Sequence, residues 1–314
     1  MSDRNALQEL NIAVLMGGSS REREVSLASG TAVLDALSSG GYRVRGIDAV
    51  GEAWWNQLAG IDLAFNSLHG PGGEGGAVQG LLDTLGIVGT GSGVLGSTLA
   101  LDKPRSKLLW QAVNLPTPSF ALVEDPSALD PLLEKWGSLF LKPAFEGSSI
   151  GVSRVSESSE IGVAWDRASR CEGPVMAEAF VDGPEYTVTI LGGRALPPIR
   201  ITSQEQFYDY AAKYELDTTG YHIPSGLTDS KEQELCELAL AAFKALGCDV
   251  WGRVDLMATE VDLTFQLLEV NTIPGMTGHS LVPKAAAAAG LSFLELDEEV
   301  LRLSWAHSGK EGQG

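Results

Sequence analysis

Two pairs of polar residues, each at alternate positions of a strand-like segment, could hold a metal ion. Glu269 and Asn271 form one pair, and Arg253 and Asp255 form the other. Alternate residues of a strand point to one face, so the two side chains of each pair lie on the same face of their strand. If the strands are neighbours, Asp255, Glu269 and Asn271 form an oxygen cluster suited to Mg²⁺, which completes its octahedron with water and phosphate. The alternative is a structural ion pair between Arg253 and a carboxylate, capped by Asn271.

Lysines that could neutralise a triphosphate are few, and Lys103, Lys142 and Lys213 stand out. Lys142 ends an apolar strand-like segment and precedes residues 146–151, with the sequence EGSSIG. Small residues let the backbone N–H groups of such a loop approach an anion closely. The alternative for any single glycine-rich loop is a surface hairpin with a lysine beside it. Because the chain has no Walker sequence, phosphate binding here needs another architecture.

Two further glycine-rich turns follow strand-like segments near the N-terminus. Residues 17–24 (GGSSRERE) enter a helix, and Glu22 could face the crevice at the carboxyl end of a parallel sheet, where such folds bind ligands. The alternative is that Glu22 has no ligand and occupies the first turn of the helix only because the helix dipole favours an acid there. Residues 69–76 (HGPGGEGG) leave His69 and Glu74 as the chemically active side chains of a close-approach loop, although a lone loop histidine is more often structural.

These residues must be positioned by helices and strands, and the order of helix-like and strand-like segments predicts an α/β region followed by an α+β region. Short apolar runs alternate with helix-compatible segments in the first third, which is typical of a doubly wound parallel sheet. The strand-like segments after residue 175 are longer, which is typical of an antiparallel sheet. We place a domain boundary near residue 97, between an N-terminal α/β domain and the α+β part that follows it. The strands are expected at 11–16, 44–47, 62–65, 120–123, 139–142, 185–191, 251–258 and 264–270, and helices at 24–37, 104–113 and 231–246.

One polar segment, residues 203–225, shows no clear period. Loops of this length are usually lids, binding loops or disordered. The segment carries Lys213 and Tyr214, and the three alternatives stay open at this point.

Composition excludes several classes of protein. Acidic residues outnumber basic ones by 41 to 22, and this charge argues against binding nucleic acid or an anionic membrane surface. Cys171, Cys236 and Cys248 show no metal-ligand or redox spacing, which favours a reducing compartment. The first apolar run, residues 12–16, is much shorter than a signal-peptide core, and no run approaches the roughly 20 residues that span a bilayer. We expect a cytoplasmic protein.

The joint order of these motifs resembles that of the D-alanine–D-alanine ligases of the ATP-grasp superfamily. The resemblance extends from residue 12 to about residue 303. It is carried by GGSSREREVS (17–26), LHGPGGEGG (68–76), TGSGVLGSTLALDKPRSKLLW (90–110), KPAFEGSSIG (142–151), FYDYAAKY (207–214), WGRVD (251–255) and LEVNTIPGMTGHSLVP (268–283).

The resemblance implies an N-terminal α/β substrate domain (1–97) followed by a two-domain ATP-grasp fold, with a central domain (98–180) and a C-terminal catalytic domain (181–314). It also implies a two-step ligation that serves peptidoglycan precursor synthesis. The carboxylate of a first D-alanine attacks the γ-phosphate of ATP, giving an acyl phosphate and ADP. The amine of a second D-alanine then displaces phosphate. The implied cofactors are ATP and two Mg²⁺ ions, which Mn²⁺ can replace, and a homodimer is the implied assembly.

The resemblance also implies catalytic roles for individual residues. Glu22 would hold the ammonium of the first D-alanine and would join Ser148 and Tyr214 in a hydrogen-bonded set. This set would close residues 203–225 over the site as a lid that excludes water. Arg253 and the backbone N–H of Gly275 would stabilise the oxyanion of the tetrahedral intermediate.

The remaining implied positions bind substrates and metal. His69 would lie near the first carboxylate, and Ser280 and Leu281 would receive the second D-alanine. The nucleotide and the metal ions would be held by Lys103, Lys142, Ser149, Glu178, Ala179, Val181, Glu185 and Lys213 for ATP, and by Asp255, Glu269 and Asn271 for magnesium.

The chain departs from the family pattern at three places. Phe145 replaces a common arginine before the glycine-rich loop, and Ala179 stands where a lysine is common after Glu178. Ala211 stands where many relatives have glutamate. Main-chain groups at Ala179 and Val181 can still pair with the adenine base.

Two rival functions fit the same motifs. One is a ligase that forms a D-alanyl-D-lactate ester. Tyr214 argues against it, because in the family this tyrosine accompanies dipeptide formation. The other is a catalytically silent binding protein on the same fold, since fold does not guarantee function. Retention of the metal ligands, Arg253 and the lysines argues against the silent protein.

Overall fold

The computed structural model describes residues 3–148, 150–202 and 219–309 of the chain. Four positions singled out above, Ser149, Ala211, Lys213 and Tyr214, lie outside the described residues.

The N-terminal sheet is parallel, as predicted, with the strand order β2-β1-β3-β4. Its central strand β1 is buried from Ile12 onward, which explains why the sequence there is apolar without alternation. A Cβ atom added at Gly30 of the following helix would lie 2.4 Å from Cβ of Met16, so this glycine lets the helix pack closely on β1. The bounds are α1 (Asp3–Gln8), β1 (Asn11–Met16), α2 (Arg23–Ser39), β2 (Arg43–Asp48), η1 (Trp54–Leu58), β3 (Leu63–Asn66), α3 (Pro71–Glu74), α4 (Ala77–Thr84) and β4 (Val88–Gly89).

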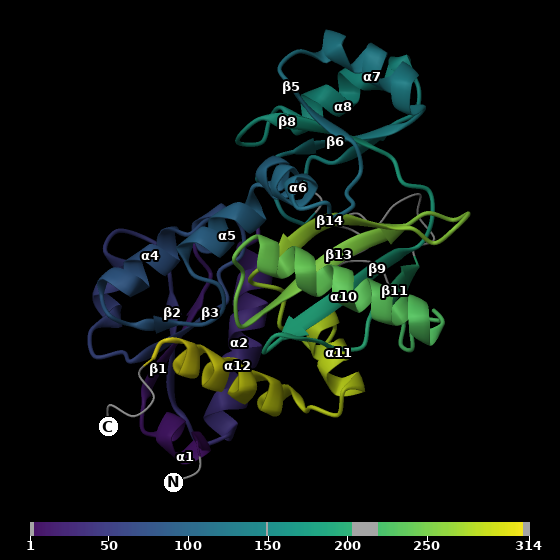
Figure 1. The fold of residues 1–314 in the computed structure, drawn as a ribbon. Coiled ribbons are helices and arrows are strands. Elements are labelled where there is room, and N and C mark those ends of the chain that lie inside the picture. The colour runs from purple at the N-terminus through teal and green to yellow at the C-terminus, as the bar shows by residue number, and fades with distance from the viewer. Residues whose placement is uncertain (1–2, 149, 203–218, 310–314) are drawn as a thin grey trace.

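A second, antiparallel sheet has the order β5-β8-β6-β7 and forms the upper part of the molecule in Figure 1. Apolar side chains from its strands and from the helices α7 and α8 pack into one core, on the face of the sheet that these helices cover. The helices α5 and α6 precede this sheet in the chain. The bounds are α5 (Val94–Leu101), α6 (Lys103–Ala112), β5 (Phe120–Val123), η2 (Pro126–Ala128), α7 (Leu129–Trp136), β6 (Leu139–Pro143), β7 (Ser153–Val155), η3 (Ser158–Glu160), α8 (Ile161–Ala168) and β8 (Val175–Ala179).

The third sheet, also antiparallel, has the path β12-β11-β9-β13-β14, with β10 paired to β9. Helix α10 crosses one face of it, and the C-terminal helix α12 packs beside α2 of the N-terminal unit (Figure 1). The mixed α/β and α+β architecture expected from the sequence is therefore confirmed. The bounds are β9 (Glu185–Leu191), β10 (Arg194–Ala195), β11 (Ile199–Thr202), β12 (Gly220–His222), α10 (Asp229–Ala245), β13 (Trp251–Ala258), β14 (Phe265–Asn271), α11 (Leu281–Ala288) and α12 (Phe293–His307).

The prediction of an irregular segment over residues 203–225 is wrong for residues 220–222. These residues form β12, which pairs with β11 in antiparallel register, Ile201 opposite Tyr221. The Gly-Tyr-His sequence of β12 has no apolar alternation, so its strand character comes from backbone pairing with a neighbour rather than from local pattern.

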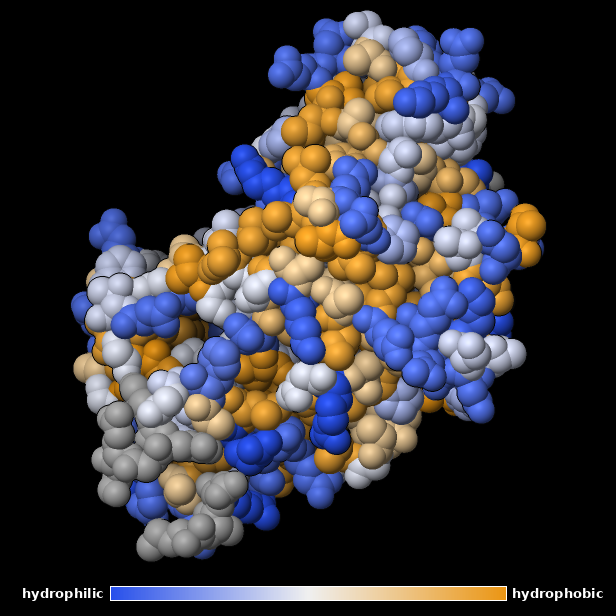
Figure 2. Space-filling model, in the orientation of Figure 1, coloured by the Kyte–Doolittle hydropathy of each residue, from blue (hydrophilic) through white to orange (hydrophobic). Residues whose placement is uncertain are grey.

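The surface carries a hydrophobic band over α5 and α6. Figure 2 shows it crossing the middle of the face seen in Figure 1. Large exposed apolar side chains on these helices and just beyond them are Val94, Leu95, Leu108 and Val113. Within the described residues, every helix is too short or too polar to cross a bilayer.

Candidate active site

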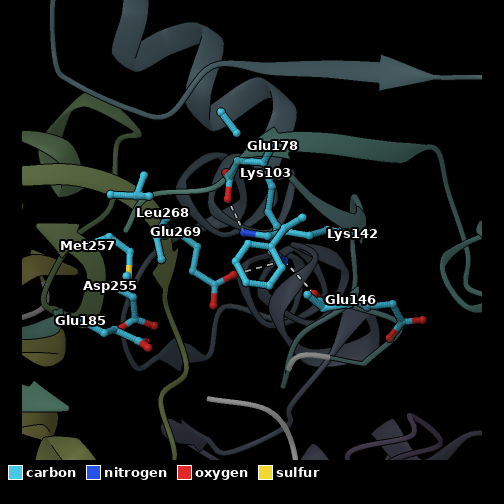
Figure 3. Close-up of a pocket in the computed structure, with 13 residues that line it drawn as sticks. Lys103, Lys142, Glu146, Glu178, Glu185, Asp255, Met257, Leu268 and Glu269 are labelled. Atoms are coloured by element: carbon cyan, nitrogen blue, oxygen red, sulfur yellow. Dashed lines mark hydrogen bonds and ion pairs between the residues drawn. The ribbon is translucent and has the colours of Figure 1, made fainter. Parts of the chain in front are cut away.

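A pocket lies between the central and C-terminal sheets. Most of its wall comes from the facing strands β6 and β8 on one side and β9, β13 and β14 on the other (Figure 3). Its charged lining mixes lysines and carboxylates, which converge from opposite sides. The lining residues are Lys103, Phe140, Lys142, Glu146, Val152, Glu178, Ala179, Val181, Glu185, Asp255, Met257, Leu268 and Glu269.

Two lysines share one buried carboxylate at the back of this pocket. Lys142 of β6 and Lys107 of α6 both pair with Glu178 of β8, whose side chain is 2% exposed. Burial alone would raise the pKa of Glu178, but the two adjacent ammonium groups lower it below its ordinary value. The carboxyl group is therefore ionised at neutral pH.

Sequence reasoning missed Lys107. A signal was present, because Lys107 lies one helical turn after Lys103 and three residues before Trp110. Lys107 and Trp110 lie on the buried face of α6. A lysine at such a position requires a buried acceptor, although the sequence does not reveal which one.

The predicted oxygen cluster forms because β13 and β14 are neighbours. Their register places Asp255 opposite Glu269 and Arg253 opposite Asn271. Arg253 donates two hydrogen bonds to Asp255, at 2.8 and 2.7 Å, and Asn271 Nδ2 donates to the same carboxylate at 3.2 Å. The ion pair between Arg253 and a carboxylate, capped by Asn271, was the structural alternative to a metal site, and its contacts are also present. Thr187 Oγ1 donates a further hydrogen bond of 2.7 Å to Asp255.

The donor set fits magnesium but not a softer metal. Within residues 3–148, 150–202 and 219–309, no group of three or more His, Cys, Asp and Glu side chains could hold a metal ion by itself. Asp255, Glu269 and Asn271 supply two carboxylates and one amide, all hard oxygen donors. Mg²⁺ commonly binds through one or two carboxylates together with substrate phosphates, so these residues fit an ion that arrives with a nucleotide.

Lys103 connects the oxygen cluster to the glycine-rich loop. Helix α6 begins at this residue, with Asp102 as its N-cap accepting from the Arg105 N–H. The Lys103 ammonium donates to the carbonyl of Glu146 at 2.6 Å and lies 3.2 Å from Oε2 of Glu269, as the dashed lines of Figure 3 mark. It can therefore meet an anion bound between the loop and the cluster.

Glu22 lies next to the end of the same loop. It is the N-cap residue of α2 and is 5% exposed, and its Oε1 accepts a hydrogen bond from Ser148 Oγ. Its Oε2 is buried without a hydrogen-bond partner among the described residues. Burial first and the Glu74 charge second raise the pKa of Glu22, while Ser148, His69 and Lys103 oppose that rise. A buried carboxylate with one unused oxygen is suited to a cation.

His69 is fixed from both sides of its ring. Its Nδ1 lies 3.5 Å from Oε1 of Glu74, and its Nε2 lies 3.3 Å from Oγ of Ser29. The same Ser29 hydroxyl accepts from the backbone N–H of Met276 at 3.1 Å. The N-terminal unit thereby contacts the loop after β14, which carries Gly275.

The loop of residues 272–280 turns tightly before α11. The Ser280 hydroxyl accepts from the Thr277 N–H at 3.0 Å and lies 2.9 Å from Oγ1 of Thr277. A Cβ atom at Gly275 would lie 3.0 Å from the Ser280 hydroxyl, so glycine leaves this space open. Leu281 then begins α11.

A series of short contacts, rather than one pocket, links the sequence-predicted residues that the structure describes. The loop from Glu146 to Ser148 connects the pocket to Glu22, and Ser148 has a positive φ of 50° that fits this tight turn. An anion held by the lysines would lie beside a carboxylate that accepts a cation. Such an arrangement suits phosphoryl transfer to a zwitterion.

Comparisons with known proteins agree with this geometry. Residues 109–302 match the family model described as the D-ala D-ala ligase C-terminus. The D-alanine–D-alanine ligase B of Pseudomonas putida is 50% identical over 301 residues, covering 95% of this chain and 94% of that protein.

Solved structures give the same result. A D-alanine–D-alanine ligase from Bacillus anthracis is 34% identical, covers 96% of this chain and 100% of its own, and superposes with a TM-score of 0.86. The structure of the Bacillus anthracis ligase complexed with ATP is 31% identical, with the same coverage and a TM-score of 0.84.

Proposed function

The chain belongs to the D-alanine–D-alanine ligase family, and we propose that it joins two D-alanine molecules to D-alanyl-D-alanine with conversion of ATP to ADP and phosphate. The observation that carries this proposal is the position of Glu22. Its unpartnered carboxylate oxygen lies one short loop away from a lysine-lined pocket. An amino acid with its ammonium on Glu22 can extend its carboxylate toward a nucleotide phosphate.

The pocket between the sheets is proposed to hold ATP. Lys103 and Lys142 would contact the inner phosphates, since phosphoryl transfer depends mainly on positioning and neutralisation of charge. Magnesium ions, with manganese as a substitute, would add neutralisation on the phosphates. The remaining contacts are assigned to Glu178, Ala179, Val181 and Glu185 for the nucleoside, Asp255, Glu269 and Asn271 for the metal ions, and Ser149 and Lys213, both outside the described residues, for the phosphates.

In the first step the carboxylate of one D-alanine attacks the γ-phosphate. Glu22 would hold the ammonium of this molecule, with Ser148 fixing the Glu22 carboxylate, and His69 would lie near the reacting carboxylate. Tyr214, which lies outside the described residues, would complete the set with Glu22 and Ser148. The products are D-alanyl phosphate and ADP, and burial of Glu22 and His69 helps to exclude water from the reactive acyl phosphate.

In the second step the amine of another D-alanine attacks the acyl carbon and phosphate leaves. The guanidinium of Arg253 and the N–H of Gly275 would stabilise the oxyanion, and Asp255 already orients that guanidinium through two hydrogen bonds. Ser280 and Leu281 would receive the second D-alanine at the start of α11. The dipeptide would enter synthesis of peptidoglycan precursors.

The cellular context extends the proposal. We place the protein in the cytoplasm, where ATP is available and where the free Cys171, Cys236 and Cys248 would stay reduced. We also propose a homodimer that buries the hydrophobic band over α5 and α6, because a contiguous exposed apolar surface is typical of an interface.

The test is ADP release with magnesium-ATP and D-alanine, beside L-alanine and beside D-alanine plus D-lactate, with products identified by mass. Turnover with D-alanine alone and a dipeptide product is expected. Ester formation from D-lactate in place of dipeptide would move the assignment to the ester-forming ligases. ATP binding without ADP release under every condition would move it to a silent binding protein.

A further inference from the structure

Lys107 is a buried lysine that the proposed chemistry leaves unused. Its side chain is 0% exposed, and its ammonium lies 2.5 Å from Oε2 of Glu178. It also donates to Oγ1 of Thr117 at 2.7 Å and to the carbonyl of Leu267 at 3.3 Å. Two hydrogen-bond acceptors and one carboxylate oxygen therefore surround this ammonium group. The charge is therefore fully paired, as a buried charge must be.

The same carboxylate also binds Lys142, which differs in its exposure. The Lys142 side chain is 14% exposed and lines the pocket, whereas Lys107 is enclosed behind it. Two ammonium groups and one carboxylate give this triad a net charge of +1. Its single surplus charge lies on the side that faces the pocket.

Without Lys107, the remaining pair of Lys142 and Glu178 would be neutral. A phosphate could then attract Lys142 only by drawing it away from a buried carboxylate with no other cation, and removing one partner of a buried pair is strongly unfavourable. With Lys107 in place, Glu178 keeps a counter-ion when Lys142 turns toward a phosphate.

We propose that Lys107 is a positioning residue for the nucleotide, which neutralises Glu178 so that Lys142 keeps its positive charge for the phosphates. The inference rests on the proposed function in one respect, that the pocket binds a nucleotide. It does not depend on which amino acid is ligated.

A double-mutant cycle tests this role by calorimetric titration with ADP and magnesium. The four proteins are the natural chain, Lys107→Met, Glu178→Gln and the double variant. We expect Lys107→Met to weaken ADP binding about ten-fold when Glu178 is present, and less than about three-fold when Gln replaces it, because coupled charges give non-additive effects. In the steady state, Lys107→Met should raise KM for ATP and leave KM for D-alanine unchanged.

The control is Ser106→Ala on the same helix. Ser106 is 1% exposed and donates to the carbonyl of Leu99 at 2.6 Å, so its loss disturbs α6 without changing charge. ADP affinity should stay unchanged in this variant.

Lys107→Met could weaken ADP binding equally with Glu178 and with Glu178→Gln, or could leave ADP binding unchanged when Glu178 is present. Either result would show that Lys107 has only a structural role and would overturn the proposal. If Lys107→Met does not fold, Lys107→Gln takes its place in the cycle, since an amide can still donate to the Leu267 carbonyl. A natural chain that makes no dipeptide would refute the proposed function, while the ADP cycle would still decide the role of Lys107.

Discussion

Glu22 must be ionised to bind an ammonium group, yet its surroundings favour the neutral acid. Burial and the nearby Glu74 raise its pKa above the ordinary value of 4.5. As pH falls through that raised pKa, Glu22 gains a proton and its attraction for the ammonium is lost. We therefore expect kcat/KM for D-alanine to fall on the acid side at a higher pH than an exposed glutamate would produce.

The variant Glu22→Gln provides the check on this pH dependence. It should lower kcat/KM for D-alanine by about 100-fold, an effect equal to roughly 2.7 kcal/mol, and should remove that acid limb from the pH profile. An unchanged acid limb would assign the titration to another group.

Glu269 tests the metal site with little disturbance of the core. Its side chain is 23% exposed at the end of β14. Replacing it with alanine should reduce magnesium-dependent turnover by about 100-fold and change the free energy of unfolding by less than about 1 kcal/mol, since partly exposed ion pairs contribute little. Turnover against magnesium concentration and thermal denaturation measure the two effects. A variant that does not fold would identify Glu269 as structural.

Tyr214 carries the prediction about product choice. Tyr214→Phe should gain ester formation with D-lactate, because the tyrosine accompanies dipeptide makers in the family that the chain resembles. Product analysis by mass, with D-alanine and D-lactate in competition, checks this. The same product ratio in both proteins would refute the use of Tyr214 as a specificity marker.

At the scale of elements, α12 contains a buried acid that opposes folding. Asp297 is 0% exposed, and neither carboxylate oxygen has a hydrogen-bond partner among the described residues. Burial and then the adjacent Glu298 raise the pKa of Asp297 well above its ordinary value of 3.8. The folded chain therefore holds a proton that the unfolded chain releases. Stability falls as pH rises from about 3.8 through the folded-state pKa, and it stays reduced above that pKa.

We expect Asp297→Asn to increase the free energy of unfolding at pH 8 by about 1–3 kcal/mol and to flatten this pH dependence. Denaturant unfolding at several pH values measures both effects. The control is Asp130→Asn, an exposed acid on α7, which should change neither. A loss of stability in Asp297→Asn would mean that the carboxylate has a favourable partner.

The loop from Glu146 to Ser148 shows how one short element can serve two subsites. The carbonyl of Glu146 accepts from Lys103 in the pocket, and the hydroxyl of Ser148 donates to Glu22 outside it. Its small residues predicted close approach to an anion. The structure adds that the far end of the loop holds a carboxylate.

At the scale of the whole molecule, the hydrophobic band over α5 and α6 predicts self-association. Leu95 is 67% exposed within it. Leu95→Glu should convert the proposed homodimer to monomer, because a charge at the apolar core of an interface loses its hydration, at a cost of several kcal/mol. Light scattering after size-exclusion chromatography measures the mass. Val163→Glu on α8, where the natural side chain is 60% exposed, is the matched control. A natural chain that elutes as a monomer would refute the dimer.

The sequence by itself determined which chemically active side chains lie together on a strand or in a turn of this protein. The alternation of Arg253 with Asp255 and of Glu269 with Asn271 predicted which side chains share a face, because this depends only on neighbouring residues. Apolar runs similarly predicted the parallel strands β1, β2 and β3 and the later strands β5, β6, β9, β13 and β14. The short strands β4, β7, β10, β11 and β12 were not predicted. The motifs indicated the ligase family, which the comparisons confirmed. The domain limits at residues 97 and 180 and the roles of the site residues remain predictions.

Only the tertiary structure decided which of these elements meet. Lys107 contacts the carbonyl of Leu267, a residue 160 positions away, and shares Glu178 with Lys142. No local pattern encodes such pairings, since they depend on how a helix and two sheets pack together. The same reason explains β12, whose three residues become a strand through pairing with β11. Local sequence thus specified the chemical groups, while packing between distant segments specified which of these groups form ion pairs and hydrogen bonds with one another.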